Sequence, residues 1–192
     1  MSYSIRLCDP VTKEPIDLPF GHIMIGGTYA AEYDASTGHF NPKPIQEAWL
    51  SITYNYAHYY FEAAEGDSRF EIQDGDAIDN GGIRGIYMKS GAESVPMLQD
   101  LIQRITDKYQ RNGEWIFTER QVSHYYDKTG AEINPNEVFI RRQTVRVEER
   151  TEMVSEGPNA NYWCATAANA ISPLYKLIAM AQLRPDGVWI GD

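Results

Sequence analysis

The sequence predicts an α+β fold: an N-terminal hairpin, three to four amphipathic helices and a small antiparallel meander around one core. Alternating apolar and polar residues predict strands near residues 3–8 and between 114 and 154. Apolar residues at spacings of three and four predict helices over 44–64, from 94 to 109 and near the C-terminus. These patterns favour antiparallel strand pairs combined with helices.

The composition is that of a globular protein. The chain has 192 residues, 43% of them hydrophobic, so it can bury an ordinary core, and we expect a single domain over 1–192. In this interpretation an acidic loop at 65–80 and a β insertion at 110–155 are embellishments. No apolar run approaches the roughly 18 residues of a membrane span, and the first ten residues lack the apolar stretch of a signal peptide. We therefore expect a cytoplasmic protein with no membrane contact.

The first third of the chain is expected to begin with strands and continue into a helix. Residues 3–8 and 16–18 would form a short hairpin, and 22–30 a further strand that glycines interrupt. A helix over 44–64 would follow, with prolines in or before its first turn. The apolar residues that define its face are Ile45, Ala48, Trp49, Ile52, Tyr56 and Ala63.

The start of the second helix is ambiguous in the sequence. Ser90 and Glu93 have the spacing of a capping box. A helix that begins there would carry Pro96 in its interior, which costs about 3 kcal/mol. We therefore expect Ser94 to cap the helix and residues 85–93 to form a loop.

The second half is expected to contain a β hairpin or meander and a C-terminal helix. Arg142, Arg146 and Arg150 would share one face of a strand, and such ladders are usually cross-strand charge pairs. Pro173 is expected to kink the helix or to open a new one. The sequence Arg-Pro-Asp-Gly at 184–187 predicts a turn.

Acidic residues are concentrated in the first half of the chain. Residues 1–96 contain 14 acidic and 6 basic side chains, whereas 97–192 contain 13 and 11. Such a field repels phosphate backbones, so we expect no direct nucleic-acid binding. Two functions remain: capture of a divalent cation, or imitation of a phosphate backbone towards a basic partner. A solvated acidic loop is the simpler alternative. The predicted partner-binding residues are Glu65, Asp67, Glu71, Asp74, Asp76 and Asp79.

The segment 81–96 contains the parts of an anion-binding turn. Glycines and the start of a helix would supply backbone amides and the positive end of a helix dipole. The predicted anion-binding residues are Arg84, Lys89, Ser90 and Gly91. The segment is not a Walker P-loop, because Met88 stands where that motif requires glycine. A structural connection, with Arg84 paired to Glu93 or to the acidic segment, is the alternative.

A third group of polar and aromatic residues is predicted to line a pocket. Tyrosine and asparagine side chains can recognise a ring or an amide. The candidates are Tyr54, Asn55, His58, Asn161, Trp163 and Asn169. The alternative is a helix packed by aromatic side chains, with Asn161 as a cap.

Familiar catalytic and metal-binding motifs are absent from the sequence. It contains no G-x-S-x-G, H-E-x-x-H, C-x-x-C or G-x-G-x-x-G pattern. The two cysteines, Cys8 and Cys164, form no spaced metal motif and no disulfide framework. We therefore predict no catalytic residue, no metal ligand and no cofactor, and we leave open whether the protein is an enzyme.

Four segments resemble a set of small proteins of phages, prophages and bacteria. They are ITYNYAHYYFEA, GGIRGIYMKSGAESVPML, NYWCATAANA and RPDGVWIGD. Proteins of this set usually read GIRxIYGKTGAES where this chain has Met88 in place of the second glycine. No established activity is associated with the set.

The resemblance to phage proteins implies a counter-defence role. Small proteins of that kind commonly occupy a nuclease or bind a nucleotide signal. Combined with the acidic segment, this predicts a binding protein that inhibits a host nucleic-acid enzyme, such as a CRISPR effector, through an acidic surface. The alternative is a pocket protein or enzyme that binds a nucleotide or another anion at 81–96.

Overall fold

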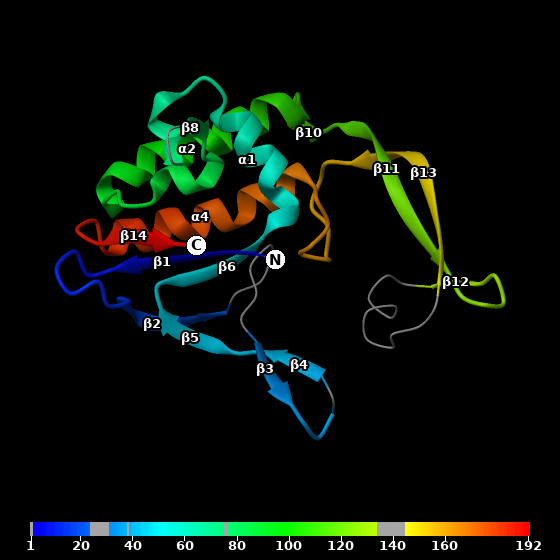
Figure 1. Ribbon diagram of the computed structural model, residues 1–192, viewed down its shortest axis with the longest axis horizontal. Coiled ribbons are helices and arrows are strands. Elements are labelled where there is room, and N and C mark those ends of the chain that lie inside the picture. The colour runs from blue at the N-terminus through cyan, green and yellow to red at the C-terminus, as the bar shows by residue number, and fades with distance from the viewer. Residues whose placement is uncertain (1, 24–30, 38, 75–76, 134–144) are drawn as a thin grey trace. The chain divides into compact units, whose positions relative to one another are not determined.

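A computed structural model describes most of the chain and shows an α+β fold (Figure 1). The described residues contain three α-helices and several small antiparallel sheets. They divide into two compact units, 1–114 with 157–192, and 115–156. The second unit nearly coincides with the β insertion expected at 110–155. The structure describes residues 2–23, 31–37, 39–74, 77–133 and 145–192.

The first unit is built on a three-stranded antiparallel sheet. Its central strand is β1 (Ser2–Cys8), with β6 (Trp49–Thr53) on one side and β14 (Val188–Gly191) on the other. Ile5 of β1 lies opposite Leu50 of β6 and both side chains are fully buried. The N-terminal and C-terminal segments of the chain are thereby joined in one sheet.

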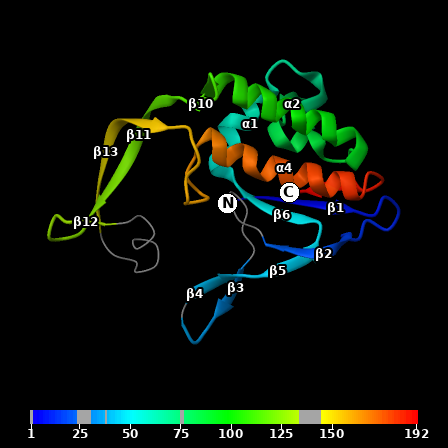
Figure 2. The ribbon, with the colours of Figure 1, turned by 180° about the vertical axis from the view of Figure 1, so that it is seen from behind.

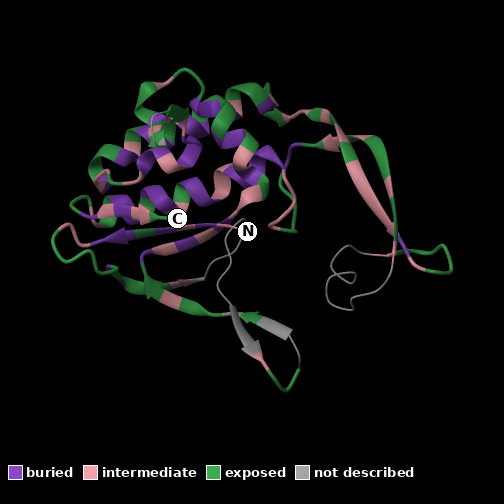
Figure 3. Ribbon diagram, viewed as in Figure 1, coloured by how far each residue is buried: buried purple, intermediate pink, exposed green. Residues whose placement is uncertain are grey.

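Three helices complete the core of this unit: α1 (Ala57–Ala64), α2 (Gly91–Tyr109) and α4 (Ala167–Leu183). Helix α4 runs alongside β14 and β1, and α2 packs against α4 (Figures 1 and 2). Buried residues gather on these helices and on β1 and β6 (Figure 3). In the part of the chain that is described, every helix is too short or too polar to cross a membrane.

The predicted helix over 44–64 is wrong for its first half. Residues 44–53 form β5 (Pro44–Glu47) and β6, followed by a 3₁₀ turn, η1 (Tyr54–Tyr56), before α1 begins. The side chains of Ala48, Leu50 and Ile52 are buried at alternate positions, which is the period of a strand. The apolar residues of this segment fit both the spacing of a helix and the alternation of a strand, and pairing with β1 favours the strand.

The predicted N-terminal hairpin is formed only beside its turn. The Asp9 amide donates to the Glu14 carbonyl at 2.9 Å and the Ile16 amide to the Leu7 carbonyl at 3.0 Å, around an antiparallel bridge of Cys8 with Pro15. Beyond the turn, β1 pairs with β6 and β14, whereas β2 (Asp17–Ile23) pairs with β5. Of the strand expected at 22–30, residues 24–30 lie outside the described part. A further strand pair is β3 (Ala31–Asp34) with β4 (His39–Pro42).

Helix α2 begins at Gly91 rather than after Ser94. The Ser90 hydroxyl accepts a hydrogen bond from the Glu93 amide, and the Glu93 carboxylate accepts one from the Ser90 amide. This capping box is present although Pro96 lies inside the helix. Carbonyl groups of the 185–187 turn also bind the amides of Gly91 and Ala92, which holds the start of the helix in place.

The C-terminal region contains a continuous helix and the expected turn. Thr166 caps α4 and the helix runs through Pro173 to Leu183, so no second helix begins there. A turn at 184–187 is confirmed, because the Gly187 amide donates to the Arg184 carbonyl at 3.1 Å. The chain then enters β14.

The second unit is a β ribbon and not the meander that was expected. Strand β11 (Phe117–Tyr126) pairs along its whole length with β13 (Arg146–Ser155), and the short β12 (Glu132–Ile133) joins the other edge of β11. Arg146 and Arg150 share a face, as predicted, but both pair with Glu148 of their own strand and not across the strands; Arg142 lies outside the described residues. A two-residue pair, β9 (Gln110–Arg111) with β10 (Glu114–Trp115), precedes the ribbon.

Candidate functional site

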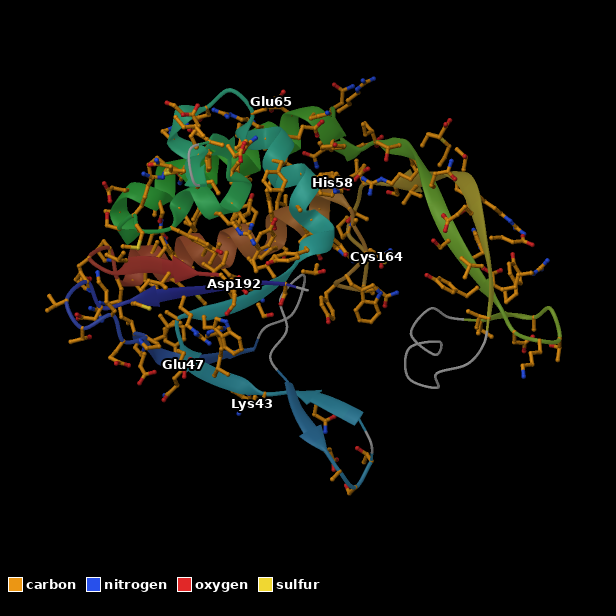
Figure 4. The ribbon with its side chains drawn as sticks, viewed as in Figure 1. Lys43, Glu47, His58, Glu65, Cys164 and Asp192 are labelled. Carbon is orange, nitrogen blue, oxygen red and sulfur yellow. The ribbon has the colours of Figure 1, made fainter. Side chains whose placement is uncertain are left out.

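The acidic segment 65–80 is folded around a buried anchor. Glu65 follows the last turn of α1 (Figure 4), and the 3₁₀ turn η2 (Ser68–Phe70) leads into the hairpin of β7 (Glu71–Asp74) and β8 (Ala77–Asn80). The Phe70 ring is fully buried. At the base of the hairpin the Asn80 side chain donates to the Phe61 carbonyl of α1 at 2.7 Å. These contacts fix the hairpin to the first unit.

Asp67, one of the predicted partner-binding residues, is paired with arginines within the first unit. Its carboxylate is only 12% exposed and lies 2.6 Å from Arg69 and 2.7 Å from Arg104. Hydrogen bonds from Arg69 lower the pKa of this carboxyl well below its usual range, although burial opposes them. The Glu62 carboxylate is similarly paired with Lys108. Arg69, Arg104 and Lys108 therefore form ion pairs with carboxylates of the same unit.

Three predicted acidic residues remain exposed: Glu65, Glu71 and Asp79. Among the residues that the structure describes, no ion pair includes any of them. Asp79 lies opposite Ile72 across the hairpin, and the neighbouring Ile78 is 71% exposed. We call Glu65, Glu71 and Asp79 the acidic surface, although Glu71, opposite Asn80, and Asp79, opposite Ile72, point to opposite faces of the hairpin. The Asp74 side chain and all of Asp76 lie outside the described part.

The backbone amides at the start of α2 already donate hydrogen bonds within the protein. The capping box occupies the amides of Ser90 and Glu93, and the Ser90 hydroxyl also donates to the Glu93 carboxylate. The next two amides donate to main-chain carbonyls, Gly91 to Gly187 at 2.7 Å and Ala92 to Pro185 at 3.0 Å. A Cβ atom at Gly91 would lie 2.7 Å from the Arg184 carbonyl oxygen, so glycine is needed for this close approach. Backbone amides are thus unavailable for an anion in this arrangement.

Arg84 and Lys89 nevertheless line one pocket of about 590 Å³. Arg84 donates to the Tyr54 hydroxyl at 3.0 Å and to the main-chain oxygen of Asp192 at 3.1 Å. The predicted pairing of Arg84 with Glu93 is not formed. The pocket walls combine both charges with apolar groups: Glu71, Ile72, Gln73, Arg84, Gly85, Tyr87, Met88, Lys89 and Asp192.

Two further residues of this pocket were not predicted from the sequence. The Tyr87 hydroxyl donates to the main-chain oxygen of Asp192 at 3.3 Å, and burial raises the pKa of that hydroxyl well above its usual value. Met88 has a φ of 63°, in the left-handed region, and its side chain is 70% exposed. Glycine adopts such a φ more readily than methionine does.

The predicted polar pocket residues are divided among separate contacts. Asn55 donates to the Trp163 carbonyl at 2.7 Å. Asn169 is buried, and its amide group binds the main chain of Asn159 and Asn161. Both asparagines therefore hold the loop before α4 in place, because their side-chain amides bind its main chain.

The aromatic residues near α1 make the same kind of contact. Tyr54 turns to Arg84, and the exposed His58 ring lies 3.8 Å from the Tyr59 ring (Figure 4). The hydroxyls of the buried tyrosines donate to carbonyls of the loop and of α4: Tyr56 to Tyr162, Tyr59 to Ala165 and Tyr60 to Ala170. The tyrosines of this helix face therefore pack in the core, as the simpler alternative proposed, but their hydroxyls bond main-chain carbonyls and Thr166, not Asn161, caps α4.

A second cavity, of about 420 Å³, lies between α1 and α2. Its charged groups are Glu62, Asp67, Arg104 and Lys108, which already pair with one another, and Glu65 at its edge. Throughout the described ranges, no group of three or more histidine, cysteine, aspartate or glutamate side chains could hold a metal ion. The acidic surface and the Arg84 pocket are therefore the two candidate sites.

Comparison with known proteins adds no relative: no family model, curated protein or solved structure matches this chain.

Proposed function

We propose that this chain is a binding protein whose acidic surface docks on a basic surface of a partner protein. The observation that carries the proposal is the contrast between two sets of carboxylates. Asp67 and Glu62 are neutralised by arginine and lysine, whereas Glu65, Glu71 and Asp79 are exposed and make no ion pair within the described residues, although Glu65 and Glu71 line pockets that also contain cations. Unpaired exposed charge attracts a partner of opposite sign.

The charge of the first unit supports a cationic partner. Residues 1–114 and 157–192 contain 19 acidic and 11 basic side chains, a net charge of −8, while residues 115–156 contain 8 and 6, a net charge of −2. The attraction therefore originates mainly in the unit that carries the acidic surface.

A host nucleic-acid enzyme is the class of partner that we propose. The groove of such an enzyme presents lysine and arginine spaced for phosphate groups, and carboxylates on a folded hairpin can occupy it. The exposed Ile78 supplies an apolar contact within the same hairpin. The resemblance to phage proteins favours a defence nuclease, such as a CRISPR effector, and hence inhibition as the outcome of binding.

The test compares two triple variants with the same change in net charge. Glu65→Gln, Glu71→Gln and Asp79→Asn remove the acidic surface. Exposed carboxylates elsewhere in the first unit provide the matched control: Glu14→Gln, Asp17→Asn and Glu47→Gln. Binding to a purified Cas9-type nuclease and its DNA cleavage are measured between 50 and about 300 mM salt, because screening weakens exposed charge pairs.

The expected result is salt-sensitive binding and inhibition by the wild type and by the control variant, with both lost in the first triple variant. Inhibition that survives in the first triple variant would reject the acidic surface as the docking site. The absence of any binding to this nuclease and to restriction nucleases would reject the enzyme class.

A nucleotide or other small anion in the Arg84 pocket is a second candidate. It is favoured by one observation, that Arg84 and Lys89 line the same cavity. A ligand at one hundred times its dissociation constant stabilises a protein by about 2.7 kcal/mol. Thermal unfolding with mono-, di- and cyclic nucleotides should then show a shift that Lys89→Gln abolishes. A panel without any shift would exclude this candidate.

A further inference from the structure

The β ribbon of the second unit has two faces of different chemistry. Successive residues of a strand point to opposite faces, and residues directly opposite each other share a face. Pairs in the β11–β13 register such as His124 with Glu148 belong to one face, and pairs such as Glu119 with Met153 to the other. We call them the charged face and the open face.

The charged side chains of the charged face pair mainly with other side chains of the second unit. Arg120 binds the fully buried Glu156 carboxylate. His124 lies 2.7 Å from Glu132 and 2.9 Å from Glu152. Glu148 is bound by two arginines of the same strand, Arg146 and Arg150, whose guanidinium groups lie 5.0 and 5.8 Å from the Tyr126 ring. This face has little charge left for a partner.

The open face is exposed and partly apolar. Eight of its ten residues are exposed, among them Phe117 at 61%, Val147 at 48% and Met153 at 62%. Of the residues that belong to this face, the charged ones are Glu119 and Glu149, both acidic. Its members are Phe117, Glu119, Gln121, Ser123 and Tyr125 with Val147, Glu149, Thr151, Met153 and Ser155.

A ribbon of this construction is incomplete by itself. Two paired strands are marginally stable in water unless an apolar face is covered. The third strand, β12, pairs at only two positions, and the described residues of the second unit contain no helix (Figure 3). Phe117 and Met153 lie in neighbouring pairs at one end of the open face, and Val147 lies opposite Tyr125 at the other end. Exposed apolar side chains on one face mark an interaction site.

We infer that the open face of the ribbon is a docking surface for a cationic, apolar strand or surface of another protein. The two carboxylates select the charge of the occupant: lysine or arginine on the partner would pair with Glu119 and Glu149 while Phe117, Val147 and Met153 contact its apolar side chains. The inference uses a different unit from the acidic surface and does not depend on it.

The same charges argue against a second copy of this chain or a lipid surface as the occupant. Two open faces packed together would bring Glu119 and Glu149 against carboxylates of the same kind, and like charges in contact are destabilising. Anionic lipid headgroups would be repelled for the same reason. Both occupants are nevertheless distinguishable in the test.

The experiment uses the full chain and three defined probes. These are strand-forming peptides of alternating leucine and lysine, of leucine and glutamate, and of leucine and serine. Binding is measured by fluorescence anisotropy and mapped by hydrogen exchange over residues 117–125 and 147–155. The variants are Phe117→Ser with Met153→Ser, and Glu119→Lys with Glu149→Lys, which leaves the apolar side chains in place. Val11→Ser with Phe20→Ser is the control, because Val11 and Phe20 are exposed to 85% and 60%.

We expect the lysine peptide alone to bind and to protect these two segments. Its affinity should fall by at least about tenfold in both ribbon variants, as for central interface residues, and should be unchanged in the control and in the acidic-surface triple variant. Binding that is lost only in the acidic-surface variant would assign the peptide to the hairpin and overturn the inference. Four other results would also overturn the inference. The glutamate peptide could bind equally well, or no peptide could bind. The wild type could form a dimer that Phe117→Ser with Met153→Ser abolishes, or it could prefer anionic vesicles.

Discussion

The indole N–H of Trp189 donates to the Ser94 hydroxyl at 2.7 Å, and both side chains are completely buried. This bond joins β14 to α2. The Ser94 hydroxyl in turn donates to the Gly91 carbonyl at 2.8 Å. The serine that was expected to cap the helix therefore holds the C-terminal strand against its first turn.

Ser94→Ala is expected to lower the free energy of unfolding by about 1 to 3 kcal/mol, because it leaves a buried indole donor without an acceptor. Chemical denaturation of Ser94→Ala, Trp189→Phe and the double variant measures the coupling between the two side chains. The double variant should be less destabilised than the sum of the single variants. Strict additivity would show that the bond is energetically unimportant.

The segments 88–94 and 185–189 were both singled out in the sequence, but their pairing was not. The amide of Met88 donates to the Trp189 carbonyl, and the amide of Trp189 donates to the Lys89 carbonyl. Main-chain bonds of this kind carry no side-chain signature. The glycines and the helix start therefore indicated an anion-binding loop. In the structure, the amides of Gly91 and Ala92 donate instead to carbonyl groups of the 185–187 turn.

Elements with an uninterrupted local pattern were predicted best. The long strands β11 and β13, the body of α2 and the 184–187 turn follow from periodicity and turn residues. The strand β6 was missed because Ile45, Ala48, Trp49 and Ile52 also fit a helix, and only the partner strand β1 decides between the two. Exposure of Glu71 and Asp79 could be expected from the sequence, but the pairing of Asp67 with Arg104 of α2 could not.

Met88→Gly is expected to stabilise the protein by about 0.5 to 1 kcal/mol. A non-glycine residue at a φ of 63° is strained, and glycine relieves that strain although it also increases the entropy of the unfolded chain. Little packing is lost, because the side chain is 70% exposed. Met88→Ala, which keeps the strain, is the matched control and should be nearly neutral. Equal stabilisation by both substitutions would contradict a backbone origin.

Asp67→Asn is expected to lower the free energy of unfolding by about 1.5 to 3 kcal/mol at neutral pH, because two arginines lose a charged acceptor. The control is Asp100→Asn, whose carboxylate also binds Arg69 but is 46% exposed, and it should cost no more than about 1 kcal/mol.

The same ion pairs predict a pH dependence in acid. The folded pKa of Asp67 lies below its ordinary value of 3.8, so its contribution is present above that pH and is lost as the pH falls through the folded pKa. Asp67→Asn should therefore flatten the acid limb of a stability profile recorded from pH 7 to pH 2. An unchanged acid limb would mean that other carboxylates determine it.

The ribbon is predicted to weaken when the His124 imidazole loses a proton. Both ring nitrogens face carboxylates, Glu132 of β12 and Glu152 of β13, and only the protonated ring can donate to both. Glu148 lies directly opposite on β13, with Arg146 and Arg150 bound to it on either side. The hydrogen bond to Glu132, supported by the charges of Glu152 and Glu132, raises the pKa of His124 above its ordinary value of 6.5.

A raised folded pKa fixes the direction of the effect. The contribution of His124 is complete below pH 6.5 and disappears as the pH rises through the folded pKa. Proton NMR should show the His124 ring titrating above 6.5, and Glu132→Gln with Glu152→Gln should lower that midpoint. His124→Gln should remove the corresponding slope from the stability profile, whereas His22→Gln, a change in the first unit, should leave it. A midpoint at or below 6.5 in the wild type would show that the carboxylates do not hold the proton on this ring.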